Sequence, residues 1–305
     1  MSGLSETRKG LLACSLAFVI WGLFPLYWHL LKAVPSDQII AHRIVWSAVL
    51  LCTLLCARQR LDWLRTIWAQ RRTFWLLALA SVVIGFNWSL YIWAVNAGHV
   101  VETSLGYFIN PLLSVLIGVV VLGERLGRLQ WVAVALAAIG VAWLTWQGGR
   151  VPWIAVGLAL SFAVYGLVRK LTSVEPVAGI GMESLFLFGP ALGWVLWAEA
   201  GHGGGFTGNW GWATLALLVA SGAVSALPLI AFTYGVRRIP LSVVGLLQYI
   251  GPTLQFLCGV LILREPFGLD RLVGFAFIWA GLAVFAVDGW RRYRRAALAA
   301  VPAAD

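Results

Sequence analysis

The chain has 305 residues, of which 61% are hydrophobic and only 11% are charged. Soluble domains carry about 25% charged residues, so this composition excludes an ordinary water-soluble protein. The formal net charge of +10 does not indicate nucleic acid as a partner, because the basic residues lie in the breaks between apolar runs. These features predict an all-α membrane protein.

Apolar runs follow one another along the chain with short polar breaks, and roughly 20 apolar residues are enough to span a bilayer. The first run follows Arg8 and Lys9 but contains Trp21 and Pro25 and lacks a small-residue cleavage site. It is therefore predicted to be a retained helix and not a signal peptide. The ten predicted transmembrane helices are about 11–31, 38–57, 74–95, 102–122, 129–146, 152–170, 178–198, 211–235, 241–262 and 270–288.

Most of the 22 Lys and Arg residues fall in alternate breaks. They precede the first predicted helix, separate the second from the third, and follow the fourth, sixth, eighth and tenth. The positive-inside rule places those breaks, and both termini, in the cytoplasm. We therefore expect a multi-pass protein of a bacterial-type inner (plasma) membrane, with lipid headgroups as partners of its basic residues.

The two halves of the chain are similar to each other. YFINPLLSVLIGVVVLGERLG at 107–127 aligns with QYIGPTLQFLCGVLILREPFG at 248–268, and this pairs Pro111 with Pro252. Each half holds five predicted helices, and because five is odd the second half must enter the membrane from the opposite side. Such inverted repeats are the basis of alternating access in transporters, with the solute site near the midplane.

The predicted domains follow from this repeat. Residues 1–147 form an N-terminal five-helix repeat, residues 148–290 an inverted C-terminal repeat, and residues 291–305 a basic cytoplasmic tail.

Several stretches of the sequence resemble the drug/metabolite transporter superfamily in its EamA-type branch, and more closely the RarD permeases, often labelled chloramphenicol-sensitive or chloramphenicol-resistance proteins. The resemblance implies a ten-helix inner-membrane carrier whose fifth and tenth helices lie outside a central cavity; it does not identify the solute. The stretches are AHRIVWS (41–47), IGFNWSLYIWAVNAGHVVETSLGYFINPL (84–112), GERLGRLQWVAVALAAIGV (123–141), FAVYGLVRK (162–170) and QYIGPT (248–253).

The equivalent prolines, Pro111 and Pro252, are candidate hinges. A proline inside a helix frees the carbonyl four residues back, which here belongs to Tyr107 or Gln248. A freed carbonyl at membrane depth must meet another helix or a cavity. We therefore expect Tyr107, Gln248 and the neighbouring Asn110 to line the solute pathway, with simple packing kinks as the alternative.

Helix 74–95 carries Asn87 and Tyr91 on one face at i, i+4 spacing. An Asn at this depth either lines a cavity or pairs with another helix, and the sequence leaves both interpretations open. Trp46 lies deep in helix 38–57, where it could stack on a solute or pack against lipid or protein.

Ionisable residues inside predicted spans are functional candidates. Arg43 is a candidate solute clamp, although it lies close enough to the membrane boundary to reach back to water. Glu183 either holds a proton or meets a cation, since burial disfavours its charge. The repeat pairs Glu183 with His42, so these two residues are predicted to form an acid–base pair across the transport path and to couple transport to protons.

Other acidic residues have plainer interpretations. Glu102 is a third coupling candidate, but its place at a predicted helix N-terminus also suits the helix macrodipole. Glu124 and Glu265 lie beside Arg125 and Arg264 and are predicted to form ion pairs with them that set a turn.

The sequence thus predicts a secondary active transporter that moves a small organic metabolite or drug-like solute by alternating access, coupled to protons or driven by exchange. Export is favoured by the resemblance alone. We expect no catalytic activity, no metal and no cofactor, because enzyme and nucleotide-binding motifs are missing. The alternatives are an intramembrane enzyme or lipid-handling protein using the His42–Glu183 pair, or a passive channel; a homodimer stays open.

Overall fold

The computed structural model describes residues 6–59, 62–123, 126–172, 174, 176–201, 204, 210–239, 243–244 and 247–299, and these form helices without a strand. The elements are α1 (Glu6–Leu30), α2 (Ser36–Gln59), α3 (Asp62–Ala69), α4 (Arg71–Asn96), α5 (Val100–Leu122), α6 (Arg128–Gly148), α7 (Trp153–Lys170), α8 (Pro176–Glu199), α9 (Gly211–Val236), α11 (Ile250–Leu257), the π-helical turn η1 (Cys258–Ile262) and α12 (Leu269–Ala299).

Nine helices in the described part of the chain are long and apolar enough to cross a membrane. They correspond to nine of the ten predicted spans. The remaining span, 241–262, is described only in part: residues 241–242 and 245–246 lie outside the described residues, and a shorter apolar helical stretch runs from Ile250 to Ile262. Gln248 and Tyr249 form a turn, and α11 begins only at Ile250. Pro252 therefore lies in the first turn of α11, where its missing N–H costs little.

Two further segments differ in detail from the expectation. The short helix α3, which the count of spans does not include, connects α2 to α4 and buries Trp63 and Ile67. The last helix, α12, continues to Ala299, so residues 291–299 of the predicted tail are helical. Residues 300–305 lie outside the described part, as does Glu124.

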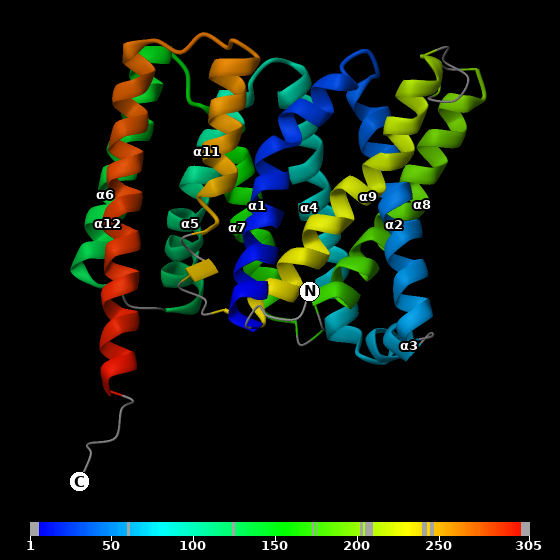
Figure 1. Ribbon diagram of the computed structural model, residues 1–305, viewed down its shortest axis with the longest axis horizontal. Helices are drawn as coiled ribbons and strands as arrows, with labels where there is room; N and C mark the ends of the chain where they lie inside the picture. Colours follow the sequence, from blue (N-terminus) through cyan, green and yellow to red (C-terminus); the bar gives the residue numbers. More distant parts are fainter. Residues whose placement is uncertain are drawn as a thin grey trace.

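Helix directions and packing follow a paired pattern. In Figure 1, α1 begins at the lower side, α7 begins at the upper side, and α12 ends at the lower side. Contacts between the halves also come in equivalent pairs: α1 packs on α9 as α4 packs on α7, and α1 packs on α11 as α5 packs on α7. Helix α2 packs on α8 and α6 on α12. One pair of equivalent contacts differs in extent: α2 packs more extensively on α9 than α8 does on α4.

Helices α6 and α12 stand as a pair at one edge of the molecule (Figure 1), as the resemblance implies for the fifth and tenth helices. Small residues let their backbones approach closely. A Cβ placed on Gly140 would lie 2.6 Å from the carbonyl oxygen of Gly274. Close contact through glycine is a common way of packing helices in membranes, where the hydrophobic effect does not drive association.

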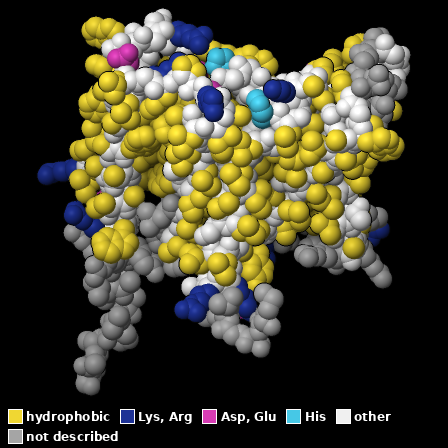
Figure 2. All heavy atoms as spheres, turned by 45° about the horizontal axis from the view of Figure 1, so that its top comes forward, with side chains coloured by type: hydrophobic (Ala, Val, Ile, Leu, Met, Phe, Trp, Pro, Cys, Tyr) yellow, Lys and Arg dark blue, Asp and Glu magenta, His cyan; other side chains and the backbone are white. Residues whose placement is uncertain are grey.

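The sides of the molecule are apolar. Figure 2 shows hydrophobic side chains over the flanks of the helices, with Lys, Arg and His gathered toward the ends. Large apolar side chains are strongly exposed there, including Val120 at 82% and Trp146 at 85%. Exposed apolar area on this scale identifies the flanks as the surface that faces lipid.

The buried core is distributed unequally between the two sides. On the upper side, one hydrophobic cluster joins α1, α2, α4 and α5 to α7 and α9; it includes Trp28, Ile39, Tyr91, Ile154 and Leu218. On the lower side, the described residues form two separate clusters. One joins α1 to the segment after α9 through residues such as Phe18 and Val244; the other joins α2, α3, α4 and α8 through residues such as Leu55. Neither of the lower clusters contains a residue of α7.

Candidate functional site

A buried arginine lies where α1, α2, α4 and α9 meet. The side chain of Arg43 is on α2 and is only 6% exposed. Its Nε donates a hydrogen bond of 2.9 Å to Oγ of Ser225 on α9. Its Cζ lies 4.4 Å from the ring centroid of Trp88 and 5.5 Å from that of Trp28. The alternative that Arg43 reaches back to water is therefore wrong, because aromatic rings and α9 enclose it.

Close packing between α2 and α9 holds Ser225 at this position. Gly222 lies one turn before Ser225, and a Cβ there would come within 2.4 Å of the backbone carbon of Trp46. Ser47 also donates a hydrogen bond of 3.4 Å to the carbonyl oxygen of Gly222. Because Gly222 has no side chain, α9 approaches α2 closely enough for Ser225 to meet Arg43.

Polar groups around Arg43 are left without hydrogen-bond partners. They are Nη1 of Arg43 itself, the hydroxyl of Tyr91 and the indole Nε1 of Trp28. Tyr91 and Tyr107 pack edge to face with ring centroids 5.7 Å apart, and both interact electrostatically with Arg43. Most buried polar groups in proteins are satisfied, so these unsatisfied donors make the surroundings of Arg43 a candidate binding site.

Asn87 forms hydrogen bonds to a neighbouring helix. Its Nδ2 donates to the carbonyl oxygen of Leu158 at 2.9 Å and to Oγ of Ser161 at 2.8 Å. Both partners are on α7, and Asn87 is 1% exposed. The residue therefore pairs α4 with α7, which is the interhelical one of the two roles that the sequence left open.

Glu183 on α8 is buried and paired with two residues of α7. Its Oε1 lies 3.3 Å from Nη1 of Arg169, and its Oε2 accepts a hydrogen bond of 3.0 Å from the hydroxyl of Tyr165. Of the two sequence expectations for Glu183, the meeting with a cation is the one observed. The sequence analysis missed Tyr165 and Arg169. Their i, i+4 spacing, which puts them on one face of α7, is the signal that could have identified them.

The predicted acid–base pair is not formed. His42 interacts electrostatically with Glu199 at the upper end of α8, whereas Glu183 lies toward the lower end. The two glutamates are 16 positions apart on one helix, which corresponds to about 24 Å at 1.5 Å per residue. Equivalence in the repeat places His42 and Glu183 at related positions, but an inverted relation puts these positions on opposite sides of the membrane.

The remaining predicted pathway residues are spread along the bundle. Trp46 faces the close contact with α9 described above. Asn110 on α5 accepts a hydrogen bond of 3.4 Å from Ser114 one turn later. Pro111 lies within α5, which continues as one helix, and Gln248 lies in the turn before α11. The candidate hinges Pro111 and Pro252 therefore have different local structures.

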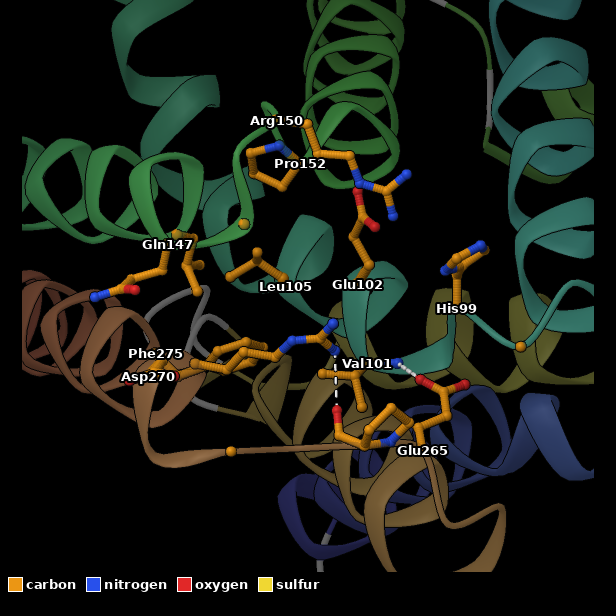
Figure 3. Close-up of a pocket in the computed structure, with 16 residues that line it drawn as sticks. His99, Val101, Glu102, Leu105, Gln147, Arg150, Pro152, Glu265, Asp270 and Phe275 are labelled. Carbon is orange, nitrogen blue, oxygen red and sulfur yellow. Dashed lines mark hydrogen bonds between the residues drawn. The ribbon is translucent and has the colours of Figure 1, made fainter.

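A pocket of about 430 Å³ opens on the upper side, between the ends of α5, α6 and α12 (Figure 3). Two acidic residues that line it bind helix N-termini. Glu102 accepts a hydrogen bond of 3.1 Å from the backbone N–H of Ile154 on α7, and Glu265 accepts one of 2.8 Å from that of Val101 on α5. The predicted ion pair between Glu265 and Arg264 is wrong, because the N–H groups at the start of α5 bind this carboxylate.

The protonation of Glu265 reflects competing effects. Burial raises the pKa of its carboxyl group, while the N–H groups of Val101 and Val100 and the charges of His99 and Arg271 oppose the rise. Figure 3 shows His99 and Glu265 on one side of the pocket and Arg150 near Glu102 on the other. In the described residues, no group of three or more His, Cys, Asp or Glu side chains could hold a metal ion.

Known proteins resemble this chain over nearly its full length. The model of the EamA-like transporter family matches residues 8–146 and 151–287 separately. A Protein RarD from Streptomyces exfoliatus is 46% identical over 97% of this chain and 93% of its own. A Protein RarD from Escherichia coli is 43% identical over 95% and 98%, and an uncharacterized transporter, YojE, from Bacillus subtilis is 42% identical over 94% and 97%.

A solved structure titled only as a crystal structure of a protein aligns with a TM-score of 0.58 at 20% identity. It covers 92% of this chain and 98% of that one. At this level of identity the likeness concerns the fold alone.

Proposed function

The chain belongs to the EamA-like transporter family and is a multi-pass membrane transporter, and from this premise we propose that it is a secondary active exporter of a small organic metabolite. We further propose that its solute binds beside Arg43 and crosses by alternating access. The buried arginine with its unsatisfied neighbours lies between helices of both halves of the chain, which is where transporters built from two repeats bind their solutes.

The unequal core is the observation that supports alternating access best. The upper cluster joins both halves, α7 included, in one continuous core, whereas among the described residues the lower side has two separate clusters, each joining the halves without α7. This arrangement fits a carrier that is closed above its solute and accessible from below. In the opposite state, the upper cluster would part while the lower clusters joined, as equivalent halves allow.

The lower side is proposed to be the cytoplasmic side of a bacterial-type inner membrane. Basic residues in the described part that lie at helix ends on this side include Arg8, Arg71, Arg128, Lys170 and Arg237. The positive-inside rule assigns such a side to the cytoplasm, together with the start of α1 and the end of α12. Access from this side suits a carrier that takes its solute from the cytoplasm.

The energy source is proposed to be an ion gradient or exchange. Of the three coupling candidates, Glu183 is the one whose proton would directly alter a described ion pair, because its contact with Arg169 is an ion pair only while Glu183 is charged. His42 interacts with Glu199 at the other end of α8, and Glu102 binds the N-terminus of α7. In proteoliposomes, Glu183→Gln is expected to abolish the pH dependence of flux; an unchanged dependence would refute the coupling role.

The enzyme or lipid-handling alternative requires His42 and Glu183 to act on one reacting bond. Their placement at opposite ends of the α2–α8 pair gives that alternative no support. A passive channel differs from a carrier in kinetics, since channel flux neither saturates nor responds to solute on the opposite side.

The test of the proposed function is counterflow. Purified protein is first screened by thermal shift against amino acids, aromatic metabolites and antibiotics, because a ligand that binds the native state raises its unfolding temperature. The stabilising solute is then loaded into proteoliposomes. A carrier is expected to give saturable uptake of labelled solute that unlabelled solute inside accelerates. Linear uptake without this acceleration would contradict the proposal and favour a channel.

A further inference from the structure

We infer that the site around Arg43 selects a small organic anion and holds it by a carboxylate group. The inference rests on the proposed function, because it names the class of solute for the same site. It assigns Arg43 as the anchor of the solute, with the aromatic side chains of Trp28, Trp88, Tyr91 and Tyr107 around its apolar part.

The first argument is the uncompensated charge of Arg43. Its side chain is 6% exposed, and its contacts are a neutral hydroxyl and two indole rings. No carboxylate forms an ion pair with it within the part of the chain that the structure describes. A buried charge is expensive unless an opposite charge and hydrogen bonds compensate it, and a bound carboxylate would supply both.

The second argument is the chemistry of the unsatisfied groups. Nη1 of Arg43 and Nε1 of Trp28 are donors and have no acceptor lone pair of their own. The hydroxyl of Tyr91 can also donate. A ligand for such a set must bring acceptors. The Nη1 of Arg43, which has no partner, can donate to a carboxylate oxygen, and charge-assisted hydrogen bonds of this type are short and strong.

The third argument concerns the rest of the solute. The rings of Trp28 and Trp88 lie over the guanidinium group, and the edge-to-face pair of Tyr91 and Tyr107 adds further aromatic surface. Sites of this kind bind flat apolar groups. Glu183 lies toward the other end of α8 and is engaged with Arg169, and Glu102 at the start of α5 accepts a hydrogen bond from Ile154. Among the described residues, the groups that contact Arg43 therefore offer no counter-charge to a solute cation.

The experiment compares three isosteric probes: benzoate, benzamide and benzamidine, which are anionic, neutral and cationic. Binding to the purified full chain is measured by thermal shift and by titration calorimetry in detergent and in nanodiscs. Benzoate is expected to bind at least about tenfold more tightly than benzamide, as a charged hydrogen bond to Arg43 requires, and benzamidine is expected to bind more weakly still. Equal binding of the three probes would overturn the inference.

Two variants separate a solute anchor from a structural side chain. Arg43→Gln removes the charge and is expected to weaken benzoate binding at least about tenfold, without lowering the unfolding temperature of the empty protein, because an uncompensated charge is lost. Arg43→Lys keeps the charge but not the planar fork, and it should bind benzoate with intermediate affinity. If Arg43→Gln lowers the unfolding temperature while benzoate binding per folded molecule is unchanged, Arg43 is structural and the inference fails.

The outcome also distinguishes this inference from the proposed function. If counterflow is found for a cationic or neutral solute and survives Arg43→Gln, the protein is a carrier but its site does not select anions. If benzoate binds through Arg43 but no solute shows saturable counterflow, the anion site stands and the proposed transport mechanism fails.

Discussion

Arg43 and Arg169 are both largely enclosed by protein, but their electrostatic surroundings differ. Arg169 on α7 lies 3.3 Å from the carboxylate of Glu183, which Tyr165 also contacts. Among the described residues, Arg43 on α2 donates to Ser225 and lies against two indole rings, with no carboxylate in an ion pair with it. The paired charge joins α7 to α8 and is part of the fold. The charge without a counter-charge has no such use, and this difference is the reason for placing the solute at Arg43.

The largest expected effect follows from breaking the paired charge. Glu183→Gln removes the carboxylate that pairs with Arg169, and breaking a buried ion pair costs about 3–5 kcal/mol. We expect the lower end of that range, because the Arg169 side chain is 15% exposed and retains some contact with solvent. Thermal unfolding of the purified protein measures the loss.

The control for this variant is the double substitution Glu183→Gln with Arg169→Gln, which removes both charges. It should be more stable than Glu183→Gln alone. If the double variant is the less stable of the two, Arg169 does not depend on Glu183 and the contrast with Arg43 disappears.

A second effect comes from separating α2 from α9. Gly222→Leu places a side chain where even a Cβ would lie 2.4 Å from the backbone of Trp46. Overpacking of this kind typically costs about 1–3 kcal/mol, and it should also move Ser225 away from Arg43 and reduce benzoate binding. The measurements are unfolding temperature and calorimetric affinity.

A matched control lies on α8, where a Cβ at Gly189 meets no atom within 4 Å. Gly189→Leu should leave both quantities nearly unchanged. Equal effects of the two variants would argue against a special role for the contact between α2 and α9.

A third substitution gives Arg43 a carboxylate partner, as Arg169 already has. Ser225→Asp brings a carboxylate to within reach of Arg43 Nε, which now lies 2.9 Å from the serine oxygen. The resulting ion pair should compete with a solute anion and weaken benzoate binding about tenfold, equivalent to about 1.4 kcal/mol. Ser225→Asn, which is neutral and of similar size, should bind benzoate nearly as the natural chain does. Tight benzoate binding by Ser225→Asp would show that the anion does not use Arg43.

The smallest effect concerns Glu265, a carboxylate outside the membrane-spanning helices. Because burial raises its folded-state pKa, its titration favours the folded state below the unfolded pKa, and this stabilisation is lost as pH rises through the folded pKa. The unfolding temperature of the natural chain should therefore fall slightly relative to that of Glu265→Gln as pH rises from acid to neutral. Parallel curves for the two proteins would exclude a titrating Glu265.

Local patterns in the sequence were enough to predict the helices. Nine predicted spans correspond to long apolar helices because the length and polarity of a span depend on the bilayer and not on its neighbours. Within 241–262 the apolar pattern did not predict the turn that Gln248 and Tyr249 form before Pro252. The repeat suggested equal structure at Pro111 and Pro252, but α5 continues through its proline. Two equivalent sequences thus adopt different local structures.

The candidate site was only partly predictable. Arg43, Tyr91 and Tyr107 were recognised as polar residues at membrane depth, and the structure brings them together. The repeat also suggested that His42 and Glu183 would meet, and they do not. The partners of Glu183, which are Arg169 and Tyr165, lie 14 and 18 positions earlier in the chain and were overlooked although their helical spacing marks them as one face.

By itself, the sequence determined that this protein lies in a membrane, that its chain has two similar halves and that its basic residues gather on one side. These properties depend on composition and order along the chain, to which the bilayer responds directly. Tertiary structure alone decided which buried charge is compensated. Ser225 is 182 positions from Arg43, and whether a carboxylate or a hydroxyl meets a guanidinium group depends on which helix faces come together.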